Sequence, residues 1–269
     1  MTKNLVWLGI LLVLALTACS DEASEPPPVI ETGIDPEAWA LVPAGEFIMG
    51  QHEHPTQVDY DYEIMVTHVT NAQYARFLNE ALADETIRFS SDGNELVSYY
   101  PGDEFHGYRH EEPIEAGDWP LVSLDDKGLR LTYEDETFRA KPGYENHPMV
   151  MVTWFGARAY CEYYGGRLPT EVEWEKAARG TDARPYPWGD TIERNNANYY
   201  SSRDLYEKIV GKLGDTTPVG FYNGKTYDGY ETLDSPSPYG LYDMGGNVWD
   251  WTGDVYEKQH YRYMRGGSR

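Results

Sequence analysis

The stretch Tyr239-Gly240-Leu241-Tyr242-Asp243-Met244-Gly245-Gly246-Asn247-Val248-Trp249-Asp250-Trp251 carries the most informative pattern in the chain. Two carboxylates, Asp243 and Asp250, enclose a Gly-Gly-Asn turn. Glycine adopts positive φ at little cost, so such a turn can direct backbone carbonyl oxygens to one point. Calcium selects carboxylate and carbonyl oxygens as ligands. From these residues alone two interpretations stay open, a calcium loop or an acidic turn whose tryptophans pack beneath it.

Six further segments are punctuated by glycine and aromatic residues in the same way. They are WALVPAGEFIMG (39–50), VTNAQY (69–74), HPMVMVTW (147–154), GGRLPTEVEWE (165–175), PWGD (187–190) and RGGS (265–268). In this order the segments resemble the sulfatase-modifying-factor family, whose founding activity is that of the formylglycine-generating enzyme. The resemblance covers roughly residues 39 to 269. It implies an α+β fold, a variant of the C-type lectin fold with little regular secondary structure.

Local patterns predict three helices. Thr70 with Gln73, and Thr170 with Glu173, have the spacing of a capping box, which predicts helices that start at these threonines. A further helix is predicted over 153–164, before a Gly-Gly pair. Its inward face is expected to carry Trp154, Ala157, Cys161 and Tyr164. Short strands are expected at 40–42, 46–49, 149–152 and 217–221.

Composition narrows the classes of function. The 269 residues carry a formal net charge of −23, with a calculated pI of about 4.5. Phosphate backbones require a basic face, so nucleic acid is excluded as a partner. Such acidity favours solubility and cation binding, although a salt-adapted surface would have the same composition. Aromatic residues make up 14% of the chain and suit an irregular core filled by large rings.

The N-terminus has the features of an export signal. Lys3 precedes an apolar run from Leu5 to Leu16 that is too short for a convincing membrane span. Leu16-Thr17-Ala18-Cys19 resembles the bacterial lipobox, in which the cysteine thiol takes the lipid. We therefore expect a lipoprotein signal peptide over 1–18, lipidation of Cys19, and a location in the bacterial cell envelope, facing the periplasm or the outer membrane. An ordinary secretory signal that contains a cysteine is the alternative.

Three segments follow the signal peptide. Residues 19–38 are acidic and rich in proline, which predicts a semi-extended tether. Residues 39–269 form the expected domain. Within it, residues 84–140 match no family segment and read as a surface insertion, with partner recognition and a solvated loop as equally open roles.

The resemblance implies a chemistry whose key residues are missing. The family enzyme uses a copper-binding cysteine pair to oxidise a sulfatase cysteine to formylglycine, and soft thiolates suit monovalent copper. That pair follows the Gly-Gly-Ser segment, and here the sequence ends at Arg269, directly after Ser268. Ser268 matches a serine of the family's active site. Two explanations stay open: the sequence is a fragment whose longer form supplies the cysteines and copper, or the protein is a non-catalytic member.

The resemblance also assigns calcium sites. Asp243 and Asp250 would give carboxylate oxygens, and Gly246 and Val248 would give backbone carbonyls. A second site matches the family only at Asn198 and Tyr199, because the segment around 213–215 departs from the pattern. His52 and His54 have no third ligand nearby in sequence, so exposed histidines are expected there.

Two functions therefore compete. The first is an oxygen- and copper-dependent oxidoreductase that acts on a sulfatase cysteine. The second is a non-catalytic, calcium-stabilised binding or envelope-scaffold lipoprotein. The expected partners are the membrane, through the lipid anchor, and a sulfatase or another envelope protein.

Overall fold

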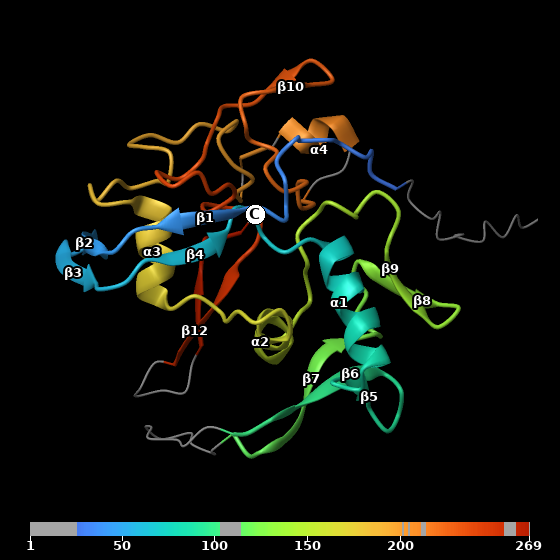
Figure 1. The fold of residues 1–269 in the computed structure, drawn as a ribbon. Coiled ribbons are helices and arrows are strands. Elements are labelled where there is room, and N and C mark those ends of the chain that lie inside the picture. The colour runs from blue at the N-terminus through green and yellow to red at the C-terminus, as the bar shows by residue number, and fades with distance from the viewer. Residues whose placement is uncertain are drawn as a thin grey trace, which may run out of the picture.

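Along the described part of the chain, runs of short strands lie on either side of one helix and of a group of three helices. The computed structural model describes residues 26–102, 114–200, 202–203, 205–210, 214–255 and 262–268. The described helices are α1 (Asn71–Ala83), α2 (Trp154–Tyr163), α3 (Glu171–Arg179) and α4 (Leu205–Val210) (Figure 1). The described strands are β1 (Trp39–Val42), β2 (Gly45–Met49), β3 (His54–Val58), β4 (Tyr62–Met65), β5 (Arg88–Phe89), β6 (Glu95–Tyr100), β7 (Gly117–Ser123), β8 (Leu131–Glu134), β9 (Thr137–Ala140), β10 (Thr226–Tyr227), β11 (Tyr230–Glu231), β12 (Asp250–Val255) and β13 (Arg262–Arg265). The fold is mixed α and β, as predicted.

The three predicted helices form where their caps place them. The Thr70 side chain accepts from the backbone N–H of Gln73, whose side chain in turn accepts from the Thr70 N–H at 2.8 Å. Thr170 and Glu173 make the same reciprocal pair at the start of α3. These bonds satisfy backbone donors that a helix start otherwise leaves unpaired.

The inward face of α2 differs in part from the prediction. Trp154 is buried as expected, but Cys161 is half-buried and Tyr164 is 44% exposed. Tyr160 is buried instead and stacks on Tyr74 of α1. Tyr164 lies outside the helix as its C-cap, so helical spacing no longer governs its direction.

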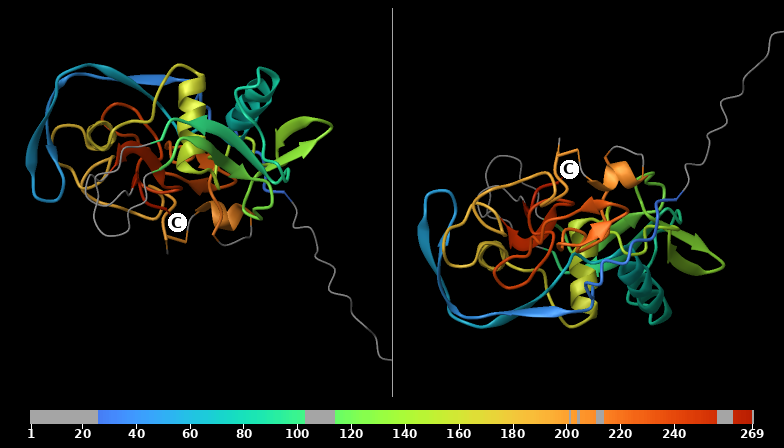
Figure 2. Two further views of the ribbon diagram at one scale, coloured as in Figure 1. Left: turned by 90° about the horizontal axis from the view of Figure 1, so that it is seen from below. Right: turned by 90° about the horizontal axis from the view of Figure 1, so that it is seen from above.

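The sheets are small and antiparallel. Within the described residues no sheet has more than three strands, and the longest pairing joins β6 to β7. The predicted strands at 40–42 and 46–49 are confirmed as β1 and β2. The strands predicted at 149–152 and 217–221 are wrong. Val152 makes only an isolated β-bridge to Val122, and residues 217–221 make hydrogen bonds to loop residues instead of to a strand. Figure 2 shows the β2–β3 and β8–β9 hairpins at opposite ends of the molecule.

Residues 84–140 do not form a surface insertion, in contrast to the prediction. Leu96 of β6 and Leu121 of β7 are fully buried. They pack in one cluster with Phe77 of α1 and Tyr160 of α2. The described part of this segment therefore supplies half of the largest core cluster. Residues 103–113 of this prediction lie outside the described residues.

The tether prediction also needs correction at its C-terminal end. Ile30 packs against the cluster of Tyr206 and Phe221, and Gln73 of α1 donates to the carbonyl of Pro36 at 2.9 Å. Residues 30–38 therefore belong to the folded body. The signal peptide, Cys19 and residues up to 25 lie outside the described residues, so the lipidation stays a prediction. No helix in the described part of the chain is long and apolar enough to cross a membrane.

Candidate functional site

Residues 239–251, here called the acidic loop, have an unusual backbone. Asp243 and Asn247 have φ of 60° and 66°, and Gly246 has φ of 132°. A Cβ on Gly246 would lie 2.5 Å from the carbonyl oxygen of Asn198. Glycine is therefore required at this position by its conformation and by the available space.

Asn247 fastens the acidic loop to the neighbouring segment. Its side-chain NH2 group donates to the carbonyl of Thr217 at 3.1 Å, and its side-chain oxygen accepts from the Thr217 N–H at 2.9 Å. Its backbone N–H donates to the carbonyl of Asn198 at 2.6 Å. The side chain is 2% exposed, so these bonds replace water in the interior. The sequence analysis identified the turn but not this role.

The two carboxylates of the acidic loop have different partners. Asp243 Oδ2 accepts from the backbone N–H of Gly220 at 2.6 Å, and burial raises the pKa of its carboxyl group. Asp250 Oδ2 accepts from the Trp174 indole at 3.0 Å. Asp250 Oδ1 lies 3.1 Å from Nε2 of His68. Each carboxylate is thus held by at least one donor from another segment.

His68 is a member of this site that the sequence analysis missed. Burial by itself lowers the pKa of its imidazole, but Asp250 and the more distant Asp243 offset this effect and raise the pKa to about 9. The residue directly precedes the capping segment of α1, far from Asp250 in sequence. No local spacing links the two, because the contact exists only after folding.

The acidic loop offers calcium an all-oxygen donor set. A Cβ on Gly266 would lie 3.3 Å from Asp250 Oδ2 and equally far from the carbonyl oxygen of Val248, so these two predicted ligands face one point. The carbonyl of Gly246 accepts from the Val248 N–H. No group of three or more His, Cys, Asp or Glu side chains suited to a metal occurs among the described residues. An ion here would therefore depend on backbone carbonyls as well as on the two carboxylates, a donor set that fits calcium.

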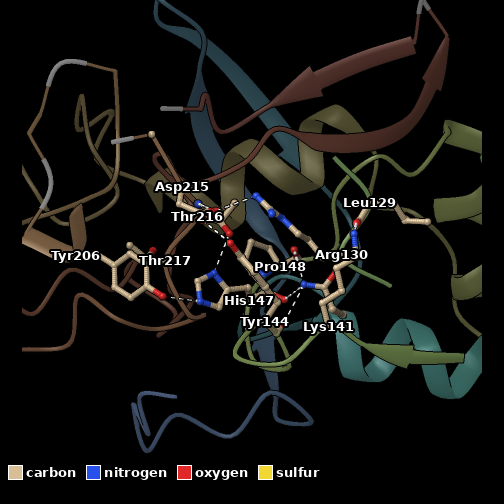
Figure 3. Close-up of polar contacts among 12 residues, drawn as sticks. Leu129, Arg130, Lys141, Tyr144, His147, Pro148, Tyr206, Asp215, Thr216 and Thr217 are labelled. Carbon is tan, nitrogen blue, oxygen red and sulfur yellow. Dashed lines mark hydrogen bonds and ion pairs between the residues drawn. The ribbon is translucent and has the colours of Figure 1, made fainter. Parts of the chain in front are cut away.

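The residues predicted for a second calcium site lie in a different setting. The Asn198 amide donates to the carbonyl of Asp215 at 2.9 Å. The Asp215 carboxylate, 2% exposed, pairs with Arg130 at 3.1 Å and accepts from the Tyr144 hydroxyl at 2.6 Å. Figure 3 shows Asp215 with Arg130 and Tyr144. Asp215 is thus engaged by protein donors, and Asn198 links this network to the acidic loop.

His147 lies at the centre of the same network (Figure 3). Its Nδ1 is 2.8 Å from the Thr216 hydroxyl, and its Nε2 is 3.0 Å from the Tyr206 hydroxyl. Burial lowers the pKa of the imidazole to about 4, so the ring is neutral at pH 7. Asn71 of α1 donates to the carbonyls of Tyr144 and His147. These buried bonds join α1 to the segments that hold the acidic loop.

A cavity of about 330 Å³ opens beside His68 and Asp250. We call it the aromatic cavity, because Trp39, Trp249 and Trp251 line it. Trp39 and Trp249 remain 55% and 53% exposed, so both lie at its mouth. Its walls thus combine apolar rings with one His–Asp pair.

Comparisons with known proteins identify the family of this chain. The family model for the sulfatase-modifying factor enzyme 1-like domain matches residues 28–269. The chain belongs to this family. The match begins close to the first residues found packed against the body, which agrees with the corrected domain start.

Named relatives include both active and inactive proteins. The chain is 29% identical to the formylglycine-generating enzyme of Streptomyces coelicolor, over 95% of this chain and 86% of that protein. It is 40% identical to the inactive C-alpha-formylglycine-generating enzyme 2 of Bos taurus, over 58% of this chain and 46% of that protein.

A kinase and one solved structure also match. The chain is 33% identical to serine/threonine-protein kinase pkn1 of Chlamydia pneumoniae, over 82% of this chain but only 28% of that protein. The chain thus spans less than a third of the kinase's length. The solved structure of CarF is 22% identical, with a TM-score of 0.47, and the match covers 86% of each chain.

Ser268, which the resemblance predicts to correspond to an active-site serine, lines a second cavity of about 390 Å³. Gly246 of the acidic loop and Trp174 of α3 contribute to the same cavity. Cys161 lines the aromatic cavity instead, and burial raises the pKa of its thiol to about 12. The described thiol and the candidate catalytic serine therefore lie in different cavities of this sulfatase-modifying-factor domain.

Proposed function

We propose that this chain is a non-catalytic binding or envelope-scaffold lipoprotein of the sulfatase-modifying-factor family, stabilised by calcium. The observation that carries the proposal is the burial of Cys161, the thiol in the described part of the chain. The 269 residues contain two cysteines: Cys19 in the expected lipidation motif, and Cys161. Thiolate is the form that binds copper and reacts, and burial holds Cys161 in the thiol form at pH 7.

The competing function is copper-dependent oxidation of a sulfatase cysteine. The similarity to the Streptomyces coelicolor enzyme favours it, with copper held by cysteines of a longer chain. The test incubates the purified protein with copper, oxygen and a sulfatase peptide that contains the target cysteine. We expect an unchanged peptide mass, with a formylglycine-generating enzyme as positive control. Conversion of the peptide by this chain would establish the enzyme function instead.

Calcium is proposed to stabilise the acidic loop rather than to take part in a reaction. Asp243 and Asp250 would hold the ion together with the carbonyls of Gly246 and Val248. The bound charge would offset the repulsion between two carboxylates in a partly buried setting. The irregular body with short antiparallel strands supports the finer assignment of the fold as a variant of the C-type lectin fold.

The proposed partner is an envelope protein, a sulfatase among the candidates, that inserts an apolar side chain into the aromatic cavity. Tryptophan is enriched among the residues that contribute most of the binding energy at protein interfaces, and Trp39 and Trp249 are exposed beside this cavity. A photo-crosslinking residue at Trp249 should form a defined adduct in envelope preparations, and Trp39→Ala should abolish it. The same crosslinker at Tyr200, which is 82% exposed, is the matched control. Equal adducts at both positions would contradict this surface.

Lipid anchoring is the third part of the proposal. The Leu-Thr-Ala-Cys sequence after an apolar run supports it. Cys19→Ser should move the protein from the membrane fraction to the soluble fraction, whereas Cys161→Ser should leave it on the membrane. Retention of the Cys19→Ser protein on the membrane would contradict the anchor.

A further inference from the structure

His68 pairs with one of the two carboxylates of the acidic loop. It lies in the segment between β4 and α1, and its side chain is 8% exposed. Its Nε2 is 3.1 Å from Asp250 Oδ1. Among the described residues, neither ring nitrogen has a hydrogen-bond partner of good geometry, so the pairing with Asp250 is the polar contact that holds the ring.

We propose that His68 is a built-in competitor of calcium for Asp250. The inference rests on the proposed calcium site. Asp250 Oδ2 faces the same point as the Val248 carbonyl but already accepts from the Trp174 indole. Calcium often takes both oxygens of a carboxylate, and the second oxygen, Oδ1, is the one that pairs with His68. Calcium takes oxygen ligands, and an imidazole nitrogen cannot join its shell on favourable terms. His68 therefore has to leave Oδ1 before that oxygen can serve the ion.

The surroundings give the ring a place to go. His68 lines the aromatic cavity, whose volume of about 330 Å³ exceeds that of one side chain. Nδ1 has no described hydrogen bond to break, so displacement costs mainly the contact of Nε2 with Asp250. His68 thus sets the calcium affinity of the acidic loop without being a ligand itself.

Calcium titration calorimetry on the full chain tests this role. His68→Gln removes the imidazole, and His68→Leu removes it without offering calcium an amide oxygen in return. We expect calcium to bind both variants at least about tenfold more tightly than the wild type. His68→Lys keeps a cation beside Asp250 and should bind calcium no more tightly than the wild type. His54→Gln, at an exposed position of β3, is the matched control and should bind like the wild type.

The outcomes separate this inference from the proposal on which it rests. Equal and measurable affinities in the wild type and in His68→Gln would overturn the competitor role and leave the calcium site intact. Absence of binding in both proteins, each shown to be folded by its melting transition, would overturn the calcium site and the inference together. Weaker binding in His68→Gln would mean that His68 supports the ion, contrary to the proposal.

Discussion

Gly246 stands where a side chain has neither the backbone conformation nor the space that it needs. Its φ of 132° belongs to a region that residues with a Cβ rarely adopt, and the carbonyl of Asn198 closes the space above it. Gly240, in the same loop, has φ of 84° but no atom near the position of a Cβ. Substitution of Gly240 would therefore strain only the backbone, whereas substitution of Gly246 would also cause a steric clash.

Gly240→Ala should lower the free energy of unfolding by about 1 kcal/mol, because only the backbone is strained. Gly246→Ala should lower it by about 3 kcal/mol, because the clash adds to the strain. Urea denaturation of both variants measures the difference. Equal effects would show that the acidic loop can move away from Asn198.

His147 makes the free energy of unfolding depend on pH, and the structure gives the direction of this dependence. Its folded pKa of about 4 lies below the ordinary value of about 6.5, so the unfolded chain binds more protons between these values. The contribution to stability is complete above about pH 6.5 and is lost as pH falls towards 4. Between pH 7 and pH 5 the free energy of unfolding of the wild type should fall by about 2 kcal/mol more than that of His147→Gln, because this variant lacks the titrating imidazole. Parallel losses in urea denaturation at the two pH values would contradict the burial of a neutral His147.

Residue-level patterns predicted only part of the site. The structure brings Asp250 and the carbonyl of Val248 to one point beside Gly266, whereas Asp215, next to the second predicted calcium site, pairs with Arg130. His68 reaches Asp250 through a tertiary contact, and no sequence spacing encodes such a contact. Local turn chemistry is readable from sequence, but the partners that a carboxylate finds across the fold are not.

The strands β6 and β7 are the elements whose position differs most from the prediction. They lie in the segment that the sequence analysis assigns to a surface insertion, yet Leu96 and Leu121 pack in one core cluster with residues of α1 and α2. Helix starts were predictable because a capping box involves residues three apart in sequence. Strand positions were less predictable, because antiparallel partners such as β1 and β4 are set by tertiary pairing.

Leu121→Ala should lower the free energy of unfolding by about 3 kcal/mol, since it leaves a cavity in the main core cluster. Leu41→Ala, at a side chain that is 58% exposed, should change it by less than about 0.5 kcal/mol. Thermal and urea denaturation provide the comparison. A small effect at Leu121 would restore the interpretation of residues 84–140 as an insertion outside the core.

At the scale of the whole molecule, short elements are held together by buried side-chain bonds rather than by one large sheet. Asn71 and His147 join α1 to the segments behind the acidic loop. Glu175 of α3 forms ion pairs with Arg179 of the same helix and with Arg265 of β13. The acidic loop contacts both networks, because Asn247 bonds to Thr217 and Asp250 accepts from Trp174 of α3. A cation bound by its two carboxylates would therefore stabilise the entire body.

The most direct test of this account is the effect of calcium on the melting temperature. With a dissociation constant near 1 mM, 10 mM calcium should stabilise the wild type by about 1.4 kcal/mol, or about 3–5 °C, relative to chelator. Asp243→Asn combined with Asp250→Asn should melt at the same temperature in calcium and in chelator. An equal response of wild type and double variant, or no response in the wild type, would contradict the calcium site on which the account depends.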